Sequence, residues 1–203
     1  MRRSPNAYAV LNKAASRNAG NRLEAGAASI RNFEPVVVPG LLQTADYARE
    51  IFRNGPIELD SDDVERLIEV RLARQEILTR DDRPRLWAAI DEAVVHRVIG
   101  SAEVMRGQLR HLADAAQQGK TTIQVMPYRA GAHAGTIGAF VILDFPEPTD
   151  SAMVYVETLA GDIYLEERSD VNRYALAFDR LLAASLHLDD SVQLIEQVAS
   201  TMT

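Results

Sequence analysis

Two acidic residues and a histidine form the most suggestive chemical group in this sequence. Asp91 and Glu92 directly follow an apolar run typical of a buried strand, and His96 lies four residues after Glu92. A spacing of four places Glu92 and His96 on the same face of a helix. A carboxyl group at the end of a buried strand can have a raised pKa and act as an acid or a base. Local features favour the plainer interpretation, in which Asp91 caps a helix and Glu92 pairs with an arginine.

A second group of candidates comes from the C-terminal half of the chain. Tyr155 and Glu157 alternate along a predicted strand, so both side chains point to one side of a sheet. His133 lies in a glycine-rich loop, where an imidazole can face a ligand. If that side of the sheet is a cavity, Tyr155 and Glu157 are ligand contacts; otherwise Glu157 occupies an edge position. We expect a pocket between sheet and helices, and its candidate ligand-binding residues are Trp87, Glu92, Tyr128, His133, Tyr155 and Glu157.

Several kinds of active site are absent from the sequence. There is no cysteine, and none of the four histidines is spaced from another as metal ligands usually are. The glycine-rich loop over residues 127–138 lacks the lysine of a phosphate-binding P-loop, and no nucleophile-elbow motif occurs. We therefore expect neither a metal nor a cofactor. If the protein is an enzyme, the expected catalytic residues are Glu92, His96 and Glu157, with His133 as an alternative assisting histidine.

The composition is that of an ordinary globular protein. The chain has 203 residues, of which 47% are hydrophobic and 25% charged, and its net charge is −7. This length fits one large domain or two small ones. The acidic balance argues against a large nucleic-acid surface, because Lys and Arg dominate binding to phosphates. No apolar run reaches membrane-spanning length and no signal peptide is evident, so we expect a cytoplasmic protein.

The order of predicted elements indicates an α+β fold. Residues 1–32 form a polar arm with two short helical pieces, and residues 33–203 form the main domain. Periodicity predicts helices at 61–79, 93–98, 102–118, 170–186 and 190–201, and strands at 86–90, 122–126, 139–145, 152–158 and 163–165. Short connections in the second half favour hairpins. We therefore expect a mostly antiparallel sheet flanked by helices.

Residues 35–51 mark the entry into this domain. Val36 to Val38 favour an extended backbone, and Pro39-Gly40 is a turn signal. Thr44 can cap the helix that follows, with Asp46 in its first turn.

Seven segments, in this order, resemble a known family. They are FEPVVVPGLLQTADYAR (33–49), RLARQEIL (71–78), LWAAIDEAVVHRVIG (86–100), MRGQLRHL (105–112), IQVMPYRAGAHAG (123–135), FVILDFPEP (140–148) and VYVETLAGDIYLE (154–166). Together they are similar to a domain of unknown function of actinobacterial regulators, over roughly residues 24 to 195. In the WhiJ-type group of developmental and antibiotic regulators, this domain follows an Xre-type helix-turn-helix.

The resemblance implies an effector domain that modulates a DNA-binding head, often beside a small acidic partner protein. No catalytic residues transfer from it. The helix-turn-helix head has no counterpart here, because residues 1–32 supply at most two short helices, so we expect no DNA binding by the chain itself.

Two functions from different classes follow. The first is a stand-alone sensing or interaction domain, a homodimer that binds a small molecule or a protein partner. The second is a small biosynthetic enzyme of the cyclase, isomerase or lyase type, which uses a carboxylate and a histidine in a pocket between sheet and helices.

Overall fold

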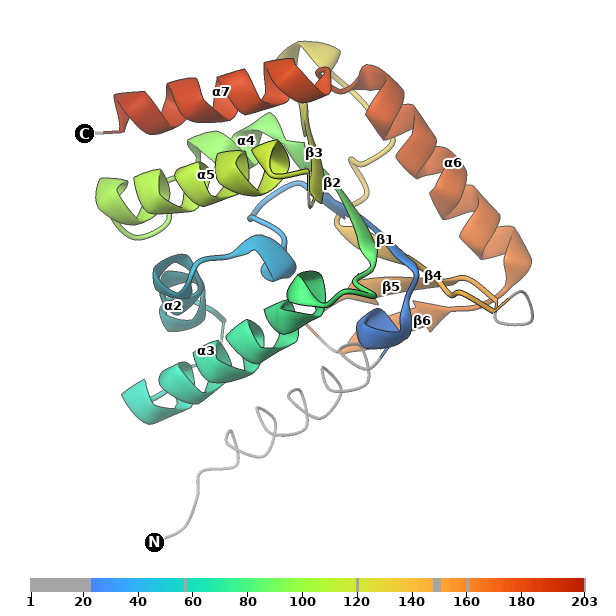
Figure 1. The fold of residues 1–203 in the computed structure, drawn as a ribbon, viewed down its shortest axis with the longest axis horizontal. Helices are drawn as coiled ribbons and strands as arrows, with labels where there is room; N and C mark the ends of the chain where they lie inside the picture. Colours follow the sequence, from blue (N-terminus) through green and yellow to red (C-terminus); the bar gives the residue numbers. More distant parts are fainter. Residues whose placement is uncertain (1–22, 57, 120, 148–150, 160, 203) are drawn as a thin grey trace, which may run out of the picture.

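A computed structural model describes residues 23–56, 58–119, 121–147, 151–159 and 161–202 (Figure 1). Its strands are β1 (Ser29–Glu34), β2 (Arg85–Asp91), β3 (Thr121–Met126), β4 (Phe140–Asp144), β5 (Met153–Glu157) and β6 (Asp162–Leu165). Its α-helices are α2 (Ala45–Arg53), α3 (Ser61–Gln75), α4 (Glu92–His96), α5 (Ala102–Gln117), α6 (Arg168–Ala184) and α7 (Leu188–Thr201). Short 3-10 turns are η1 (Gly40–Leu42), η2 (Glu76–Thr79) and η3 (Tyr128–Ala130). The α+β class is confirmed.

The six strands form one mixed sheet, so the expectation of a mostly antiparallel sheet is wrong. The strand order is β3-β2-β1-β4-β5-β6; β1, β2 and β3 are parallel, whereas β4, β5 and β6 are antiparallel to their neighbours. Helices connect β1 to β2 and β2 to β3, and a helical crossover returns the chain in the same direction. The hairpin signals of the second half do not extend to the first.

Helices cover the two faces of the sheet unequally. Helix α6 lies on one face and α2, α3, α5 and α7 lie on the other (Figure 1). Because side chains alternate along a strand, Ile30 of β1 packs in the core under α5 and α7, whereas Phe33 packs in the core under α6 with Phe178. Strand β1 therefore contributes to both cores from the middle of the sheet.

Strand β1 is the element that the sequence analysis missed. Residues 23–26 are helical as expected, but the chain becomes extended at Ser29, and β1 crosses the expected boundary between residues 32 and 33. Residues 1–22 of the expected arm lie outside the described residues. The alternation signal was hidden because Asn32 and Glu34 occupy the face that normally carries apolar residues. Every expected strand and helix from residue 61 onward is present, within a few residues of its predicted bounds.

Three glutamines hold the segment between β1 and α2. Gln108 of α5 is fully buried; its Oε1 accepts from the Thr44 amide and its Nε2 donates to the Leu42 carbonyl, both at 2.7 Å. Gln75 of α3 donates to the carbonyls of Gly40 and Gln43 at 2.9 and 2.8 Å. The Gln43 side chain donates to the Val38 carbonyl at 2.7 Å. These amides replace the backbone partners that an irregular buried segment lacks.

This network makes Gln108→Leu strongly destabilising. The substitution keeps the volume similar but leaves two backbone groups, at Leu42 and Thr44, without partners. An unpaired buried group costs about 1–3 kcal/mol, so we expect the free energy of unfolding to fall by about 2–4 kcal/mol. Chemical denaturation measures the change.

Gln117→Leu on the same helix is the matched control. Its amide bonds the exposed Glu196, so we expect a change within about 0.5 kcal/mol. If the two substitutions lowered the free energy of unfolding equally, the buried hydrogen bonds of Gln108 would stabilise the fold no more than the exposed bond of Gln117.

Candidate functional site

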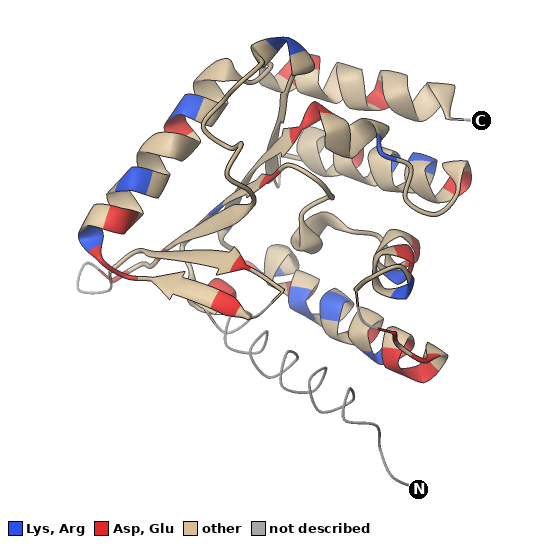
Figure 2. Ribbon diagram, turned by 180° about the vertical axis from the view of Figure 1, so that it is seen from behind, with Lys and Arg blue, Asp and Glu red and all other residues tan. Residues whose placement is uncertain are grey.

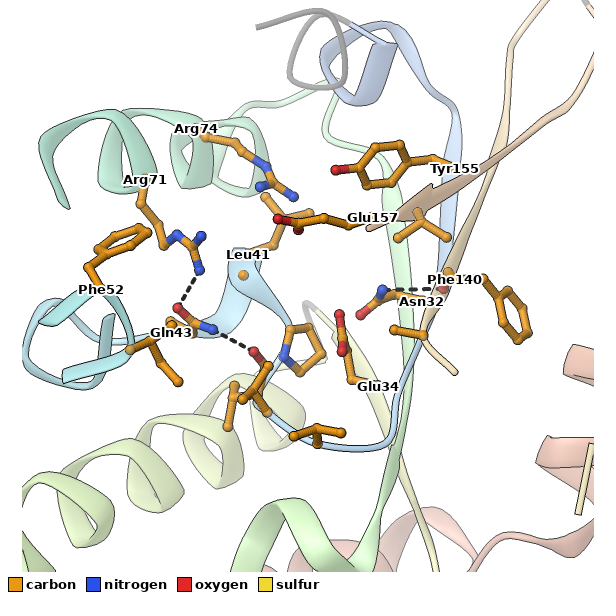
Figure 3. Close-up of a pocket in the computed structure, with 18 of the residues that line it drawn as sticks. Asn32, Glu34, Leu41, Gln43, Phe52, Arg71, Arg74, Phe140, Tyr155 and Glu157 are labelled. Atoms are coloured by element: carbon orange, nitrogen blue, oxygen red, sulfur yellow. Dashed lines mark hydrogen bonds between the residues drawn. The ribbon is translucent and has the colours of Figure 1, made fainter. Parts of the chain in front are cut away.

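A pocket of about 890 Å³ lies against β1, β4 and β5, on the same face of the sheet as α3. Its floor is formed by Ile30, Asn32 and Glu34 of β1 together with Tyr155 and Glu157 of β5. The segment 36–41 and helix α3 form the opposite wall, with Arg71 and Arg74 pointing inward (Figure 3). Helices α5 and α7 contact β3, at the other end of the sheet. The half of this face that β1, β4 and β5 form is therefore left for the pocket.

Glu34 is the most perturbed group of the pocket floor. Burial raises the pKa of this carboxyl from its ordinary 4.5 to about 8, and the nearby charge of Glu157 adds to the effect. A side-chain hydrogen bond with Asn32 and the charges of Arg71 and Arg74 act in the other direction but are weaker. At neutral pH Glu34 is therefore mostly a neutral carboxylic acid, able to donate as well as accept a hydrogen bond.

Asn32 presents a buried acceptor to the same space. The residue is only 6% exposed, and its Nδ2 donates to the Phe140 carbonyl at 3.4 Å. Its Oδ1 has no hydrogen-bond partner within the part of the chain that the structure describes. A buried amide oxygen without a partner is unusual and costs free energy, which is typical of a position that a ligand completes.

The two arginines of α3 are held by neighbouring groups. Arg74 makes a bidentate ion pair with the nearly buried Glu24, at 2.6 and 2.7 Å. Burial is the largest single influence and acts to lower the pKa of Arg74, but the charge and hydrogen bonds of Glu24, with smaller effects of Tyr155 and Glu157, together outweigh it and the pKa is raised. Arg71 donates to the Gln43 side chain and lies over the Phe52 ring, 4.7 Å from its centre. Both guanidinium groups therefore stay charged in fixed positions.

Tyr155 and Glu157 are the predicted site residues that lie in this pocket. They alternate on β5 as expected and both point into the cavity (Figure 3). Burial raises the pKa of the Tyr155 hydroxyl, and the charge of Glu157 raises it further. Tyr155 is therefore a neutral hydrogen-bonding group at every physiological pH.

Trp87, expected in the pocket, lies on the opposite face of the sheet. Its ring packs edge-on against Phe178 of α6, and its indole N–H donates to the Gln124 side chain at 3.1 Å. The reason is register: Trp87 is one residue away from Leu86 and Ala88, which face the other core.

Glu92, His96 and Tyr128 form a separate group beyond the end of β2. Glu92 accepts from the Tyr128 amide at 2.7 Å, and His96 Nε2 lies 3.4 Å from the Glu92 carboxylate. The His96 ring stacks on the Tyr128 ring, which is 58% exposed. The expected proximity of Glu92 and His96 is therefore present. None of the three residues lines the pocket, however.

His133 fixes the glycine-rich loop instead of facing the pocket. Its Nδ1 accepts from the Gly135 amide at 3.2 Å, and its Nε2 lies 3.4 Å from Asp91, which also caps α4. The loop runs from β3 to β4 across the ends of β2 and β1. Gly135 rests on the Phe33 ring so closely that a Cβ atom there would overlap it.

Several polar residues of the pocket were not predicted from the sequence, among them Asn32, Glu34, Arg71 and Arg74. The first two lie on the missed strand. The arginines lie on a helix where acidic residues interleave with basic ones, a pattern typical of a solvated face, as Figure 2 shows along α3. Their spacing of three, which places both on one helix face, was the available signal.

Comparison with known proteins identifies a family for this chain. A family model described as a domain of unknown function (DUF5753) matches residues 21–197. No curated protein and no solved structure matches the chain. Among the described residues, no helix combines the length and apolar character that crossing a membrane requires, and no three His, Cys, Asp or Glu side chains gather as a metal site would need.

The raised pKa of Glu34 predicts how stability depends on pH. Between pH 4.5 and about 8 the unfolded chain has released this proton and the folded chain retains it. Stability from this group is therefore lost as pH rises through that window, by about 1.4 kcal/mol per pH unit at most. Glu34→Gln removes the effect, so the free-energy difference between variant and wild type should shift in favour of the variant from pH 5 to pH 8.

Denaturation at several pH values measures this difference. Glu166→Gln, at an exposed position, is the control with the same charge change. A difference that stays constant over the window would contradict a retained proton on Glu34.

Proposed function

Because the chain belongs to the DUF5753 family, whose model covers most of its length, we propose one function for the domain as a whole: it binds a small molecule in the pocket between β1, β5 and α3. The ligand is mainly apolar, since Val, Leu, Ile, Pro and Phe side chains dominate the lining. Binding sites of this kind combine an apolar wall with a few convergent polar groups.

The observation that carries this proposal is the unpartnered Oδ1 atom of Asn32. It lies at the floor of a large cavity, beside a carboxyl group that burial keeps neutral. Leaving a buried acceptor unpaired costs about 1–3 kcal/mol, and a ligand donor in the cavity recovers that free energy.

A sensing role fits the pocket and the sequence resemblance together. The seven segments are similar to effector domains of actinobacterial helix-turn-helix regulators. The resemblance implies a domain that responds to a signal and modulates a DNA-binding head. A bound ligand would contact α3 through Arg71 and Arg74. Helix α3 is therefore the element that would transmit binding to a small acidic partner protein or to a second copy of the chain. The interleaved charges of α3 and α6, with the net charge of −7, favour a domain that does not itself bind DNA (Figure 2).

Blocking the pocket mouth tests the proposal. Val36 lines the pocket and is 49% exposed, so Val36→Trp fills the entrance without disturbing the core. The neutral apolar dye Nile red should bind wild type at one saturable site, and Val36→Trp should weaken binding about tenfold or more. Fluorescence titration measures both.

Val98→Trp is the control, because Val98 is similarly exposed, at 56%, and is not among the residues that line the pocket. Dye binding should match wild type in this variant. If both tryptophan variants bind the dye as wild type does, or both lose it equally, small-molecule binding at this pocket is refuted.

A second candidate is acid–base catalysis in the same pocket. It is favoured by one observation: two carboxyls, Glu34 and Glu157, act on each other in a largely apolar cavity, and one is held neutral. Glu34 then acts as the acid, and Glu157, which the sequence analysis names among the catalytic candidates, acts as the base.

Turnover of a bound compound distinguishes the two functions. If wild type converts a ligand that Val36→Trp excludes, Glu34→Gln should retain binding while lowering the rate at least about 100-fold, the usual contribution of a general acid. Chromatography of the incubated ligand measures this. An unchanged ligand after prolonged incubation with wild type leaves sensing as the function.

A further inference from the structure

We propose that the ligand of this pocket carries a cationic nitrogen, such as an ammonium or amidinium group on a mainly apolar body, which binds between Asn32 and Glu34. This inference rests on the proposed small-molecule function and specifies the chemistry of the ligand.

The first support is the pair of acceptors on β1. Asn32 and Glu34 are two residues apart, so their side chains emerge on the same face of the strand, next to each other in the pocket (Figure 3). With Glu34 ionised, its two carboxylate oxygens and the Asn32 Oδ1 are all acceptors, and none of them can donate to another. An ammonium has three donors and no acceptor, which matches this set.

The second support is the charge balance of the lining. Three carboxylates, Glu24, Glu34 and Glu157, face two guanidinium groups, Arg71 and Arg74, among the described residues of the pocket. With all five ionised, the sum is one negative charge. A single positive charge on the ligand neutralises it; without such a ligand, Glu34 stays protonated.

The arginines do not fill this role themselves. Arg74 is committed to Glu24 through two hydrogen bonds, and Arg71 is held over Phe52 by its bond to Gln43. Both belong to the wall opposite β1 (Figure 3).

Binding of such a cation is coupled to a proton. At pH 7 the pKa of about 8 keeps Glu34 largely protonated, and the bound cation favours its ionised form, so the carboxyl proton leaves to the buffer. The other titratable or charged groups around Glu34 are Glu157 and Tyr155 of β5, Arg71 and Arg74 of α3, and Tyr47 of α2. Burial raises the pKa of both tyrosines, so neither loses a proton near pH 7.

Three probes with one apolar body test the assignment. Each has a naphthyl-butyl group that ends in an ammonium, a hydroxyl or a carboxylate. Isothermal titration at pH 7 should give the ammonium compound a dissociation constant at least about tenfold below that of the alcohol. Titration in buffers of different ionisation enthalpy should show close to one proton released per ammonium bound, and none for the alcohol.

Two variants separate Glu34 from general charge effects. Glu34→Gln should abolish the proton release and most of the preference for ammonium, whereas Glu166→Gln, with the same charge change on the surface, should leave both intact. Circular dichroism confirms that each variant is folded. In wild type at about pH 9, where Glu34 is mostly ionised before binding, the proton release should largely disappear.

Other outcomes overturn the assignment. Equal affinity of the three probes, tightest binding of the carboxylate, or no binding of the ammonium compound contradicts a cationic ligand. If Nile red still binds and Val36→Trp still blocks it, pocket binding stands and only the cation is refuted. If Nile red binding is also insensitive to Val36→Trp, the proposed function fails as well.

Discussion

The structure depends on how the chain satisfies its backbone between β1 and α2. This segment leaves the centre of the sheet and crosses to the helical layer without regular hydrogen bonding, yet Val38, Leu41 and Leu42 are buried. Buried peptide groups must have partners, and here the partners are glutamine side chains from α2's own entry, from α3 and from α5. The network ties the three helices to the wall of the pocket, so the wall is rigid although it is not a helix or a strand.

The pocket follows from the mixed topology of the sheet. Helical crossovers place α5 and its neighbour α7 beside β2 and β3, whereas the described residues between β4 and β5, 145–147 and 151–152, are not helical. Among the described residues, this face of β1, β4 and β5 is roofed by α3, the end of α2 and the glutamine-held segment. The cavity forms where the parallel part of the sheet meets the antiparallel part. The strand at that junction is β1, which supplies Asn32 and Glu34 to the cavity.

Sequence patterns predicted most of the elements but only part of the site. Long periodic helices such as α5 and α6 and the apolar strand β4 follow directly from the spacing of apolar residues. Tyr155 and Glu157 were found because their strand has a clear alternation. Strand β1 was missed for the reason that makes it functional: polar residues at 32 and 34 remove the apolar pattern that identifies a strand. The parallel pairing of β1 with β2 could not be predicted from local sequence patterns either, because it joins residues more than 50 positions apart.

The contact between Gly135 and Phe33 bears on how the chain selects its strand alignment. A shift of β1 by one residue would exchange the two faces of the strand, placing Asn32 and Glu34 in the apolar core under α6 and the Phe33 ring in the cavity. The ring packs closely against Gly135, in a loop that His133 and Asp91 hold in place. A polar strand is ordinarily poor at choosing its register. Here the hydrophobic residue behind the pocket makes that choice, so the two acceptors in front can be retained without loss of a unique fold.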